Sequence, residues 1–222
     1  MCGRYTLTQT EDLGEFFEIN DTRLAGRFNI APTQNVAVVR LTPDGERELV
    51  QMRWGLLDAW HAAGQTGHIN ARSESVARKP AFSKAFSKRR CLVPADGFFE
   101  WQQAGGVSHP YYVRRRDHGL FALAAIWEPD AKLGDTFAVL TCQAARLLVH
   151  VHDRMPVMLE RQQCQAWFEA ESRPGDLASL MAPYPEDLLE LVPVGRMVNS
   201  VANDSPACIE PEQHRQLQGK LF

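Results

Sequence analysis

The chain has 222 residues, of which 45% are hydrophobic, so it is long enough to bury a substantial core and has the composition of an ordinary globular protein. Its formal net charge of −3 argues against a surface that coats nucleic acid over its whole area. No apolar run is long enough to span a bilayer and no signal peptide is present, so we expect a cytoplasmic protein with no membrane partner. The five cysteines have no paired spacing, which disfavours a disulfide framework or a zinc site.

Charge is unevenly distributed along the chain. Between Arg72 and Arg116 there are ten lysines and arginines against three acidic residues, whereas the chain from Asp153 onward is predominantly acidic. A basic segment of this kind is usually a solvated face, and it is otherwise a positively charged surface for an anionic partner. Alone it is weak evidence for nucleic-acid binding.

Helical patterns are short and scattered. Thr8 and Glu11 have the spacing of a capping box and precede apolar residues three and four apart, which predicts a short helix beginning at Thr8. A proline at position 80, followed by phenylalanines at 82 and 86, predicts a second short helix. Later helical patterns cover 144–150, 160–171 and 176–181.

Strand-like segments make up most of the remaining chain. A turn-like loop over 29–33 leads into a strand over 36–41, and Pro43-Asp44-Gly45 predicts a hairpin turn into a second strand that ends at Trp54. Further strand-like runs cover Cys91–Pro94, Phe98–Trp101, Tyr111–Arg114, Leu120–Ile126, Phe137–Cys142 and Pro156–Leu159. Many short strands with single helices between them predict an α+β fold in one domain over residues 1–222, with sheets curling around a shared core.

Cys2 directly follows Met1. Removal of Met1, which a small second residue favours, would leave a cysteine whose α-amine and thiol form a 1,2-aminothiol. The amine, with a pKa of about 8, condenses with an aldehyde to a Schiff base, and the thiol then closes a five-membered thiazolidine ring. On position alone, a chance residue in a disordered start is the favoured interpretation of Cys2, and only the other motifs reverse it.

Three further clusters are candidates for chemistry. Asn70 and Arg72 would face one side of a strand and suit a polar or phosphorylated group, although a plain surface edge has the same pattern. Glu100 lies among large aromatics and is either a solvent-facing strand residue or a desolvated acid with a raised pKa. His152 beside Asp153 suits proton transfer better than metal binding, because no third ligand has recognisable spacing. We therefore expect no metal and no cofactor.

Aromatic and basic residues are interleaved in a way that suits single-stranded nucleic acid. Trp54, Trp60 and Trp101 lie near Arg4 and the basic segment in the sequence. Such rings stack on bases while the arginines contact phosphates. The alternative is that these tryptophans belong to the core, which is the more common location for this residue type.

The candidate clusters also belong to a longer ordered set of motifs. The set consists of Met1-Cys2-Gly3-Arg4-Tyr5, Arg27-Phe28-Asn29-Ile30-Ala31-Pro32-Thr33, Trp54-Gly55-Leu56, Ile69-Asn70-Ala71-Arg72, Arg90-Cys91-Leu92-Val93-Pro94-Ala95-Asp96-Gly97-Phe98-Phe99-Glu100-Trp101 and His152-Asp153-Arg154-Met155-Pro156. In this order they closely resemble the SOS-response-associated peptidase (SRAP) family, whose members shield abasic sites in single-stranded DNA. The resemblance runs from residue 2 to about residue 206.

The resemblance implies a fold and a set of site residues. The fold would consist of twisted, mostly antiparallel sheets forming an open barrel-like core with flanking helices. Cys2 would crosslink to the abasic sugar, with Asn70, Glu100 and His152 at the other active-site positions. Residues matching positions that line the DNA cleft or the active site are Arg4, Asn29, Pro32, Arg72, Trp101, Arg154, Asn199 and Ser200.

Two positions depart from the family pattern. The family often has proline where this chain has Asp58, and some relatives have an aromatic residue at the position of His61. An acid beside a phosphate-binding cleft would weaken DNA affinity, so the contacts made by residues 58–61 stay open.

The sequence therefore predicts a protein that senses and shields abasic sites in single-stranded DNA through a thiazolidine crosslink at Cys2. Glu100 would take a proton from the amine, His152 or Glu100 would open the sugar ring, and weak lyase activity is expected as a side reaction. We expect a monomer associated with the nucleoid during DNA damage. Two alternatives stay open, namely a thiol peptidase using Cys2 and His152, including self-removal of Met1, and a noncovalent single-strand binding module.

Overall fold

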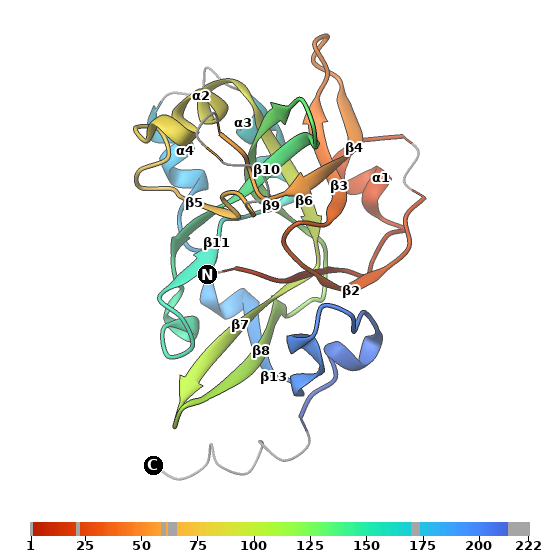
Figure 1. Ribbon diagram of the computed structural model, residues 1–222, viewed down its shortest axis with the longest axis vertical. Helices are drawn as coiled ribbons and strands as arrows, with labels where there is room; N and C mark the ends of the chain where they lie inside the picture. The colour runs from red at the N-terminus through yellow and green to blue at the C-terminus, as the bar shows by residue number, and fades with distance from the viewer. Residues whose placement is uncertain (1, 21–22, 59–60, 62–65, 170–173, 213–222) are drawn as a thin grey trace.

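The computed structural model describes residues 2–20, 23–58, 61, 66–169 and 174–212, and its strands are gathered in two sheets with few helices (Figure 1). Within the described residues, no helix is long and apolar enough to cross a membrane. The α-helices are α1 (Leu13–Phe17), α2 (Pro80–Lys88), α3 (Arg161–Phe168) and α4 (Pro174–Leu180). The 3-10 helices are η1 (Arg146–Leu148), η2 (Glu186–Leu188), η3 (Arg196–Asn199) and η4 (Pro206–Cys208).

One sheet has five strands, and each of its neighbouring pairs is antiparallel. In spatial order the strands are β13 (Leu189–Pro193), β8 (Val107–Arg115), β7 (Gly97–Ala104), β1 (Tyr5–Leu7) and β2 (Arg27–Ile30). In Figure 1 the long β7–β8 hairpin forms the lower arm of the molecule, beside the blue segment that carries η3 and η4.

The second sheet has eight strands and closes partly on itself. In spatial order they are β11 (Arg154–Pro156), β10 (Gly134–Gln143), β4 (Arg47–Trp54), β3 (Asn35–Leu41), β6 (Arg90–Ala95), β9 (Phe121–Asp130) and β12 (Met158–Leu159), with β5 (Asn70–Arg72) paired to β10. Because β9 also pairs with β10, strands β10, β4, β3, β6 and β9 form a ring. The only parallel pairings among the described strands are β10 with β4 and β10 with β5. The predicted α+β class with mostly antiparallel sheets is confirmed.

The core lies inside this ring and between the two sheets. Every residue from Phe121 to Ile126 is buried, as expected for a strand covered on both faces. The ring of Tyr5 in β1 meets the indole of Trp54 at a centroid distance of 5.4 Å, which joins one sheet to the other. Trp54 has no exposed surface, and its Nε1 donates a hydrogen bond to the Ile69 carbonyl at 2.9 Å. Trp54, which was predicted as a DNA contact, thus takes the alternative location in the core, where a fully buried ring offers no face to a base.

Several predicted boundaries need correction. The first helix begins at Leu13 instead of Thr8, and its N-cap residue Asp12 makes no side-chain cap. The 29–33 segment is a loop only after Ile30, because Asn29 and Ile30 belong to β2. The helix expected over 144–150 shrinks to the single 3-10 turn of η1. The strand expected over 156–159 is divided into β11 and β12, with Val157 between them.

Asp96 explains why the helix does not start at Thr8. This carboxylate lies between β6 and β7 and is 3% exposed. Its Oδ2 accepts hydrogen bonds from the Thr8 hydroxyl at 2.6 Å, the Gln9 backbone N–H at 2.9 Å and the Thr8 backbone N–H, while Oδ1 accepts one from the Thr6 hydroxyl. The Thr8 side chain is thus committed to a partner 88 residues away along the chain.

Asp96→Ala should lower the free energy of unfolding by about 3 kcal/mol or more, because it leaves several donors without an acceptor in a buried place. Urea denaturation would measure the change. The control is Asp117→Ala, which removes an exposed carboxylate paired with Arg115 and should cost about 1 kcal/mol or less. Equal losses in the two variants would contradict the assigned role of Asp96.

Candidate active site and nucleic-acid interface

Cys2 is held beside β7 by the strand that follows it. Tyr5 lies opposite Phe98 in the antiparallel register, and the Phe99 N–H donates to the Arg4 carbonyl at 3.0 Å. Continuing this register brings the chain before Arg4 toward Glu100. Cys2 itself is fully buried, and its carbonyl accepts a hydrogen bond from Asn70 Nδ2 at 2.9 Å.

Asn70 begins β5, a strand of three residues laid parallel to β10. Val139 N donates to the Ile69 carbonyl at 3.1 Å, so the start of β5 is anchored directly before Asn70. Asn70 Oδ1 is buried and accepts no hydrogen bond among the described residues. Ala71 is buried whereas Arg72 is exposed, so this edge presents an amide acceptor at one end and a guanidinium at the other.

Burial sets the protonation of Cys2 and Glu100. Glu100 is 2% exposed, and burial raises its pKa to about 7, so it changes charge near neutral pH. Burial, together with the neighbouring Glu100 charge, raises the pKa of the Cys2 thiol well above its ordinary value. At neutral pH the thiol is therefore protonated, and the carboxyl beside it is poised to accept or release a proton.

His152 lies in the loop before β11 and is half-buried. Its Nδ1 accepts a hydrogen bond from the Arg154 backbone N–H at 2.9 Å, so the neutral ring carries its proton on Nε2. Burial lowers the pKa of His152, even though the nearby Asp153 acts in the opposite direction. The same loop lies near β7, because the Gln102 side chain donates to the His150 carbonyl at 3.2 Å and the Asp153 charge acts on Glu100.

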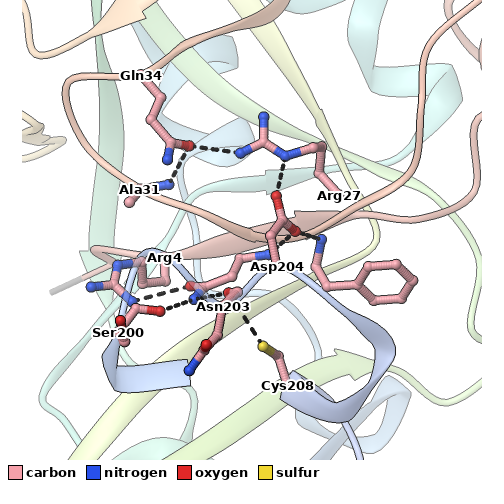
Figure 2. A network of polar contacts seen from close by, with 10 residues as sticks. Arg4, Arg27, Ala31, Gln34, Ser200, Asn203, Asp204 and Cys208 are labelled. Atoms are coloured by element: carbon pink, nitrogen blue, oxygen red, sulfur yellow. Dashed lines mark hydrogen bonds and ion pairs between the residues drawn. The ribbon is translucent and has the colours of Figure 1, made fainter. Parts of the chain in front are cut away.

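Arg4 and Asn29 form a polar network with η3 and the residues that follow it. Figure 2 shows Arg4, Ser200 and Asn203 of this network. Asn29 is buried, its Oδ1 accepts from Arg4 at 3.1 Å, and its Nδ2 lies within hydrogen-bond distance of the carbonyls of Val198, Ser200 and Asn203. Asn29 thus holds the segment Val198-Asn199-Ser200 in place. Its side-chain amide is engaged inside the protein, and its assignment to the DNA cleft or active site stays a prediction.

Asp204 completes this network and was not predicted. Its carboxylate accepts from the backbone N–H groups of Phe28 at 2.6 Å and Asn29 at 3.0 Å, and it pairs with the Arg27 guanidinium (Figure 2). The partners are more than 170 residues apart in the sequence, and no local spacing signals such a contact. Asp204 therefore fastens the C-terminal part of the chain to β2.

A partly exposed cluster next to this network consists of Trp101, Asn199 and Arg4. The Trp101 Nε1 donates to Asn199 Oδ1 at 2.8 Å, and the Arg4 guanidinium lies 5.9 Å from the centre of the Trp101 ring. Ser200 is exposed next to Asn199, and Pro32 is half-buried in the turn after β2. The assignment of these residues to a DNA surface stays a prediction.

Arg154 and Trp60 are the two remaining residues that were predicted at the DNA interface. Arg154 is 6% exposed, and its guanidinium is paired with Glu74 at 2.5 Å and also donates to the Thr141 carbonyl. A guanidinium engaged in this way holds β11 against β10, and the assignment of Arg154 to the DNA cleft or active site stays a prediction. Trp60 lies outside the described residues.

Potential metal ligands converge at one place within the described part of the chain, and the predicted site residues are not among them. They are Asp58, His61 and His68, which lie between β4 and β5. Sequence reasoning missed this group, because spacings of three and seven residues between its members match no metal-binding motif.

A family model described as "SOS response associated peptidase (SRAP)" matches residues 1–201 of the chain, a range that includes Cys2, Asn70, Glu100 and His152. The chain belongs to the SRAP family. The expected family membership is therefore confirmed.

Two bacterial relatives match over nearly their whole length. The Abasic site processing protein YoqW of Bacillus subtilis (strain 168) is 34% identical over 223 residues, which cover 95% of this chain and 99% of that protein. The Abasic site processing protein YedK of Escherichia coli (strain K12) is 30% identical, with coverage of 95% and 100%. A crystal structure of a protein from Bacteroides thetaiotaomicron shares the fold, with a TM-score of 0.79 at 21% identity and coverage of 95% and 100%.

Asn29→Ala should detach the 198–203 segment from β2, because it removes three hydrogen bonds to carbonyls and leaves Arg4 without a side-chain acceptor. We expect the free energy of unfolding to fall by about 2–3 kcal/mol, with faster amide hydrogen exchange confined to β2 and this segment. The matched control is Asn35→Ala at the exposed start of β3. Unchanged exchange in the 198–203 segment would contradict the supporting role of Asn29.

Proposed function

We propose that this SRAP protein processes abasic sites in single-stranded DNA by forming a thiazolidine crosslink between the abasic sugar and Cys2, after Met1 has been removed. The names of its relatives, which are abasic site processing proteins, support the substrate. The observation that carries the chemistry is the hydrogen bond from Asn70 to the Cys2 carbonyl, in a place where the Glu100 charge also acts on Cys2.

The proposed reaction begins at the α-amine. The open form of an abasic sugar carries an aldehyde at C1′, and the neutral amine of Cys2 adds to this carbon. Loss of one water leaves an imine, and the sulfur then bonds to the same carbon while the thiol proton passes to the nitrogen. One C–N bond and one C–S bond replace the C=O bond, so aldehyde and aminothiol become a thiazolidine and water. Hydrolysis at the imine stage is avoided when ring closure is fast.

Each of the residues around Cys2 has a role in one step of this reaction. Glu100, with a pKa of about 7, accepts the proton that the ammonium form of Cys2 must lose. His152 in its imidazolium form donates the Nε2 proton to the ring oxygen of the closed sugar, while the C1′ hydroxyl loses its proton to water, and the ring opens to the aldehyde. The carbonyl of the Asn70 amide accepts a hydrogen bond from a sugar hydroxyl and so orients C1′ for closure. A residual imine would allow strand cleavage by β-elimination, which accounts for weak lyase activity.

The state of the thiol favours this chemistry over a thiol peptidase. Cysteine peptidases attack with a thiolate whose pKa is depressed by a neighbouring cation. Here burial and the Glu100 charge move the pKa of Cys2 the other way. A protonated thiol is a poor first nucleophile but a competent second one, because addition to an imine carbon follows amine attack and is intramolecular.

The proposed DNA surface consists of the exposed residues around this site. Arg72 at the end of β5 contacts a backbone phosphate, and the Trp101 ring stacks on a base beside Arg4. Asn199, Ser200 and Pro32 border the same region, with Pro32 limiting duplex on one side. Single strands are preferred because stacking needs unpaired bases. The protein acts as a monomer in this proposal.

Incubation with an abasic single-stranded oligonucleotide should give an adduct that survives boiling and detergent on a gel. Cys2→Ser keeps the amine and should give only an imine that borohydride can trap, because no thiol is present to close the ring. Insertion of a glycine between Met1 and Cys2 keeps the thiol but moves the amine, and it should also abolish the stable adduct. Intact mass measurement would establish that Met1 is absent from the reactive chain.

Three outcomes would overturn parts of the proposal. A stable adduct with Cys2→Ser would exclude the thiazolidine. Equal affinity for intact and abasic strands without any adduct would favour a noncovalent binding module. Peptide hydrolysis that disappears in Cys2→Ala, in a protein that forms no adduct, would favour the peptidase.

The single-turnover rate of adduct formation should rise as the pH passes through about 7, because ionised Glu100 is the proton acceptor. In Glu100→Gln the rise of the rate near pH 7 should be absent, and the rate should depend on pH only through the ionisation of the Cys2 α-amine. Crosslinking between about pH 5 and 9 under excess protein would measure it, with Glu48→Gln on β4 as the control. A profile of Glu100→Gln that equals the wild-type profile would exclude Glu100 as the acceptor.

A stability measurement separates this role from simple misfolding. The folded-state pKa of Glu100 is raised, so its ionised form destabilises the fold above about pH 7 and not below about pH 4.5. Glu100→Gln should therefore raise the free energy of unfolding at pH 8 by up to about 3 kcal/mol, with the gain disappearing at acidic pH. Lower stability of this variant at pH 8 would contradict the assignment.

A further inference from the structure

A carboxylate and two imidazoles meet in the segment between β4 and β5. Asp58 Oδ1 lies 2.8 Å from His61 Nδ1, and Asp58 Oδ2 lies 3.3 Å from His68 Nε2. The rings of His61 and His68 meet edge to face at a centroid distance of 4.6 Å. One potential ligand atom from each residue lies within 4.8 Å of the other two. The side chains of Asp58 and His61 are 12% and 13% exposed, whereas that of His68 is 39% exposed, so the cluster is open to solvent on the His68 side.

These separations are close to those of a metal site. Ligand atoms about 2.0–2.2 Å from a tetrahedral zinc ion lie about 3.3–3.6 Å from one another. The two Asp58 oxygens lie 2.8 Å from His61 Nδ1 and 3.3 Å from His68 Nε2, and one ligand atom from each of the three residues lies within 4.8 Å of the others, so side-chain movements of about 1 Å reach the spacing of a metal site. Two imidazoles and one carboxylate are a ligand set for zinc-like ions, whereas calcium and magnesium prefer oxygen ligands alone.

The hydrogen bonding of His61 also favours a cation. The Asp58 backbone N–H donates to His61 Nδ1 at 3.2 Å, so the lone pair of this nitrogen faces the side of the ring where the Asp58 carboxylate lies. A lone pair and an anionic oxygen 2.8 Å apart repel each other unless a proton or a metal ion lies between them. A metal ion satisfies the carboxylate and both rings at once and would replace the backbone hydrogen bond.

The backbone around the cluster is well anchored. Leu56 and His68 exchange two backbone hydrogen bonds of 2.8 and 2.9 Å, which hold the two ends of the segment together. Leu57 N donates to the Thr136 hydroxyl at 3.1 Å, and the His68 ring packs against Phe82 at 4.9 Å. Asp58 also borders a cavity of about 320 Å³, which gives solvent access for a further ligand. Fixed ligands of this kind reduce the cost of organising a metal site.

We propose that Asp58, His61 and His68 bind one divalent transition-metal ion of the zinc type, with an open position for water. The site is independent of the covalent chemistry proposed for Cys2. A bound ion would crosslink Asp58 and His61 to His68, which lies two residues before Asn70, and would so fix the start of β5 relative to the end of β4. The two positions at which the chain departs from the family pattern, Asp58 and His61, are thereby both metal ligands.

Metal titration of the untagged full-length chain tests the proposal. Isothermal titration with Zn²⁺ should show saturable binding of one ion, and Co²⁺ should give visible bands without the near-ultraviolet sulfur-to-cobalt transition, since the site holds no sulfur. Asp58→Asn and His68→Gln should each weaken Zn²⁺ binding by about tenfold or more. His109→Gln, on β8 of the other sheet, is the matched control and should bind like the wild type.

The readouts distinguish this site from binding at the aminothiol. A cobalt spectrum with a sulfur transition that disappears in Cys2→Ala would place the ion at Cys2 and overturn the proposal. No saturable binding by the wild type would also overturn it and would leave a carboxylate bridged to two histidines by protons. Circular dichroism of Asp58→Asn and His68→Gln without metal would establish that both variants fold.

Discussion

The pairing of β1 on both of its edges is the constraint on which the candidate site depends. This strand has only three residues, yet it lies between β2 and β7 and its Tyr5 ring packs on Trp54 of the other sheet. A chain fixed in this way has a single course available ahead of Tyr5, along β7 toward Glu100. The first residues of a protein are usually poorly ordered unless tied down, and here the tie is a sheet with an inter-sheet aromatic contact. The position of Cys2 is therefore a property of the whole fold.

Burial then decides the chemistry of the groups that this constraint brings together. The pKa of the Cys2 thiol and that of the Glu100 carboxyl are raised, whereas the pKa of His152 is lowered. All three shifts favour the uncharged form, which is the signature of desolvation. An amine that must attack as a free base is served by such surroundings, and a thiolate is not. The same environment that lets Glu100 exchange protons near neutral pH also lowers the stability of the fold, as is common at functional sites.

The sheets could be predicted from the sequence because their signal is local. Runs such as 91–94 and 121–126 are continuously apolar, and strands covered on both faces require this pattern. The site residues Cys2, Asn70, Glu100 and His152 were expected from motifs, and hydrogen bonds or electrostatic contacts link their segments.

What the sequence could not predict depends on contacts between distant residues. Thr8 has a helix-capping pattern, but the Asp96 carboxylate binds its hydroxyl instead. Trp54 was expected at a DNA surface, and the arrival of Tyr5 from the other sheet buries it. Asn29 lies in a motif expected at the cleft, yet its amide donates hydrogen bonds to backbone carbonyls in the segment 198–203. In each case the partner is fixed only when the tertiary structure is complete.

The pairing of Arg154 with Glu74 has a consequence for the thermodynamics of DNA binding. A guanidinium already neutralised inside the protein displaces no condensed cation from a phosphate, so it adds nothing to the entropy of counterion release. Arg72 and Arg4 remain as cations near the site, and Arg4 is partly engaged by backbone carbonyls. The counterion release on strand binding would then come from Arg72 and Arg4, and stacking on Trp101 would supply a part of the affinity that does not depend on ionic strength.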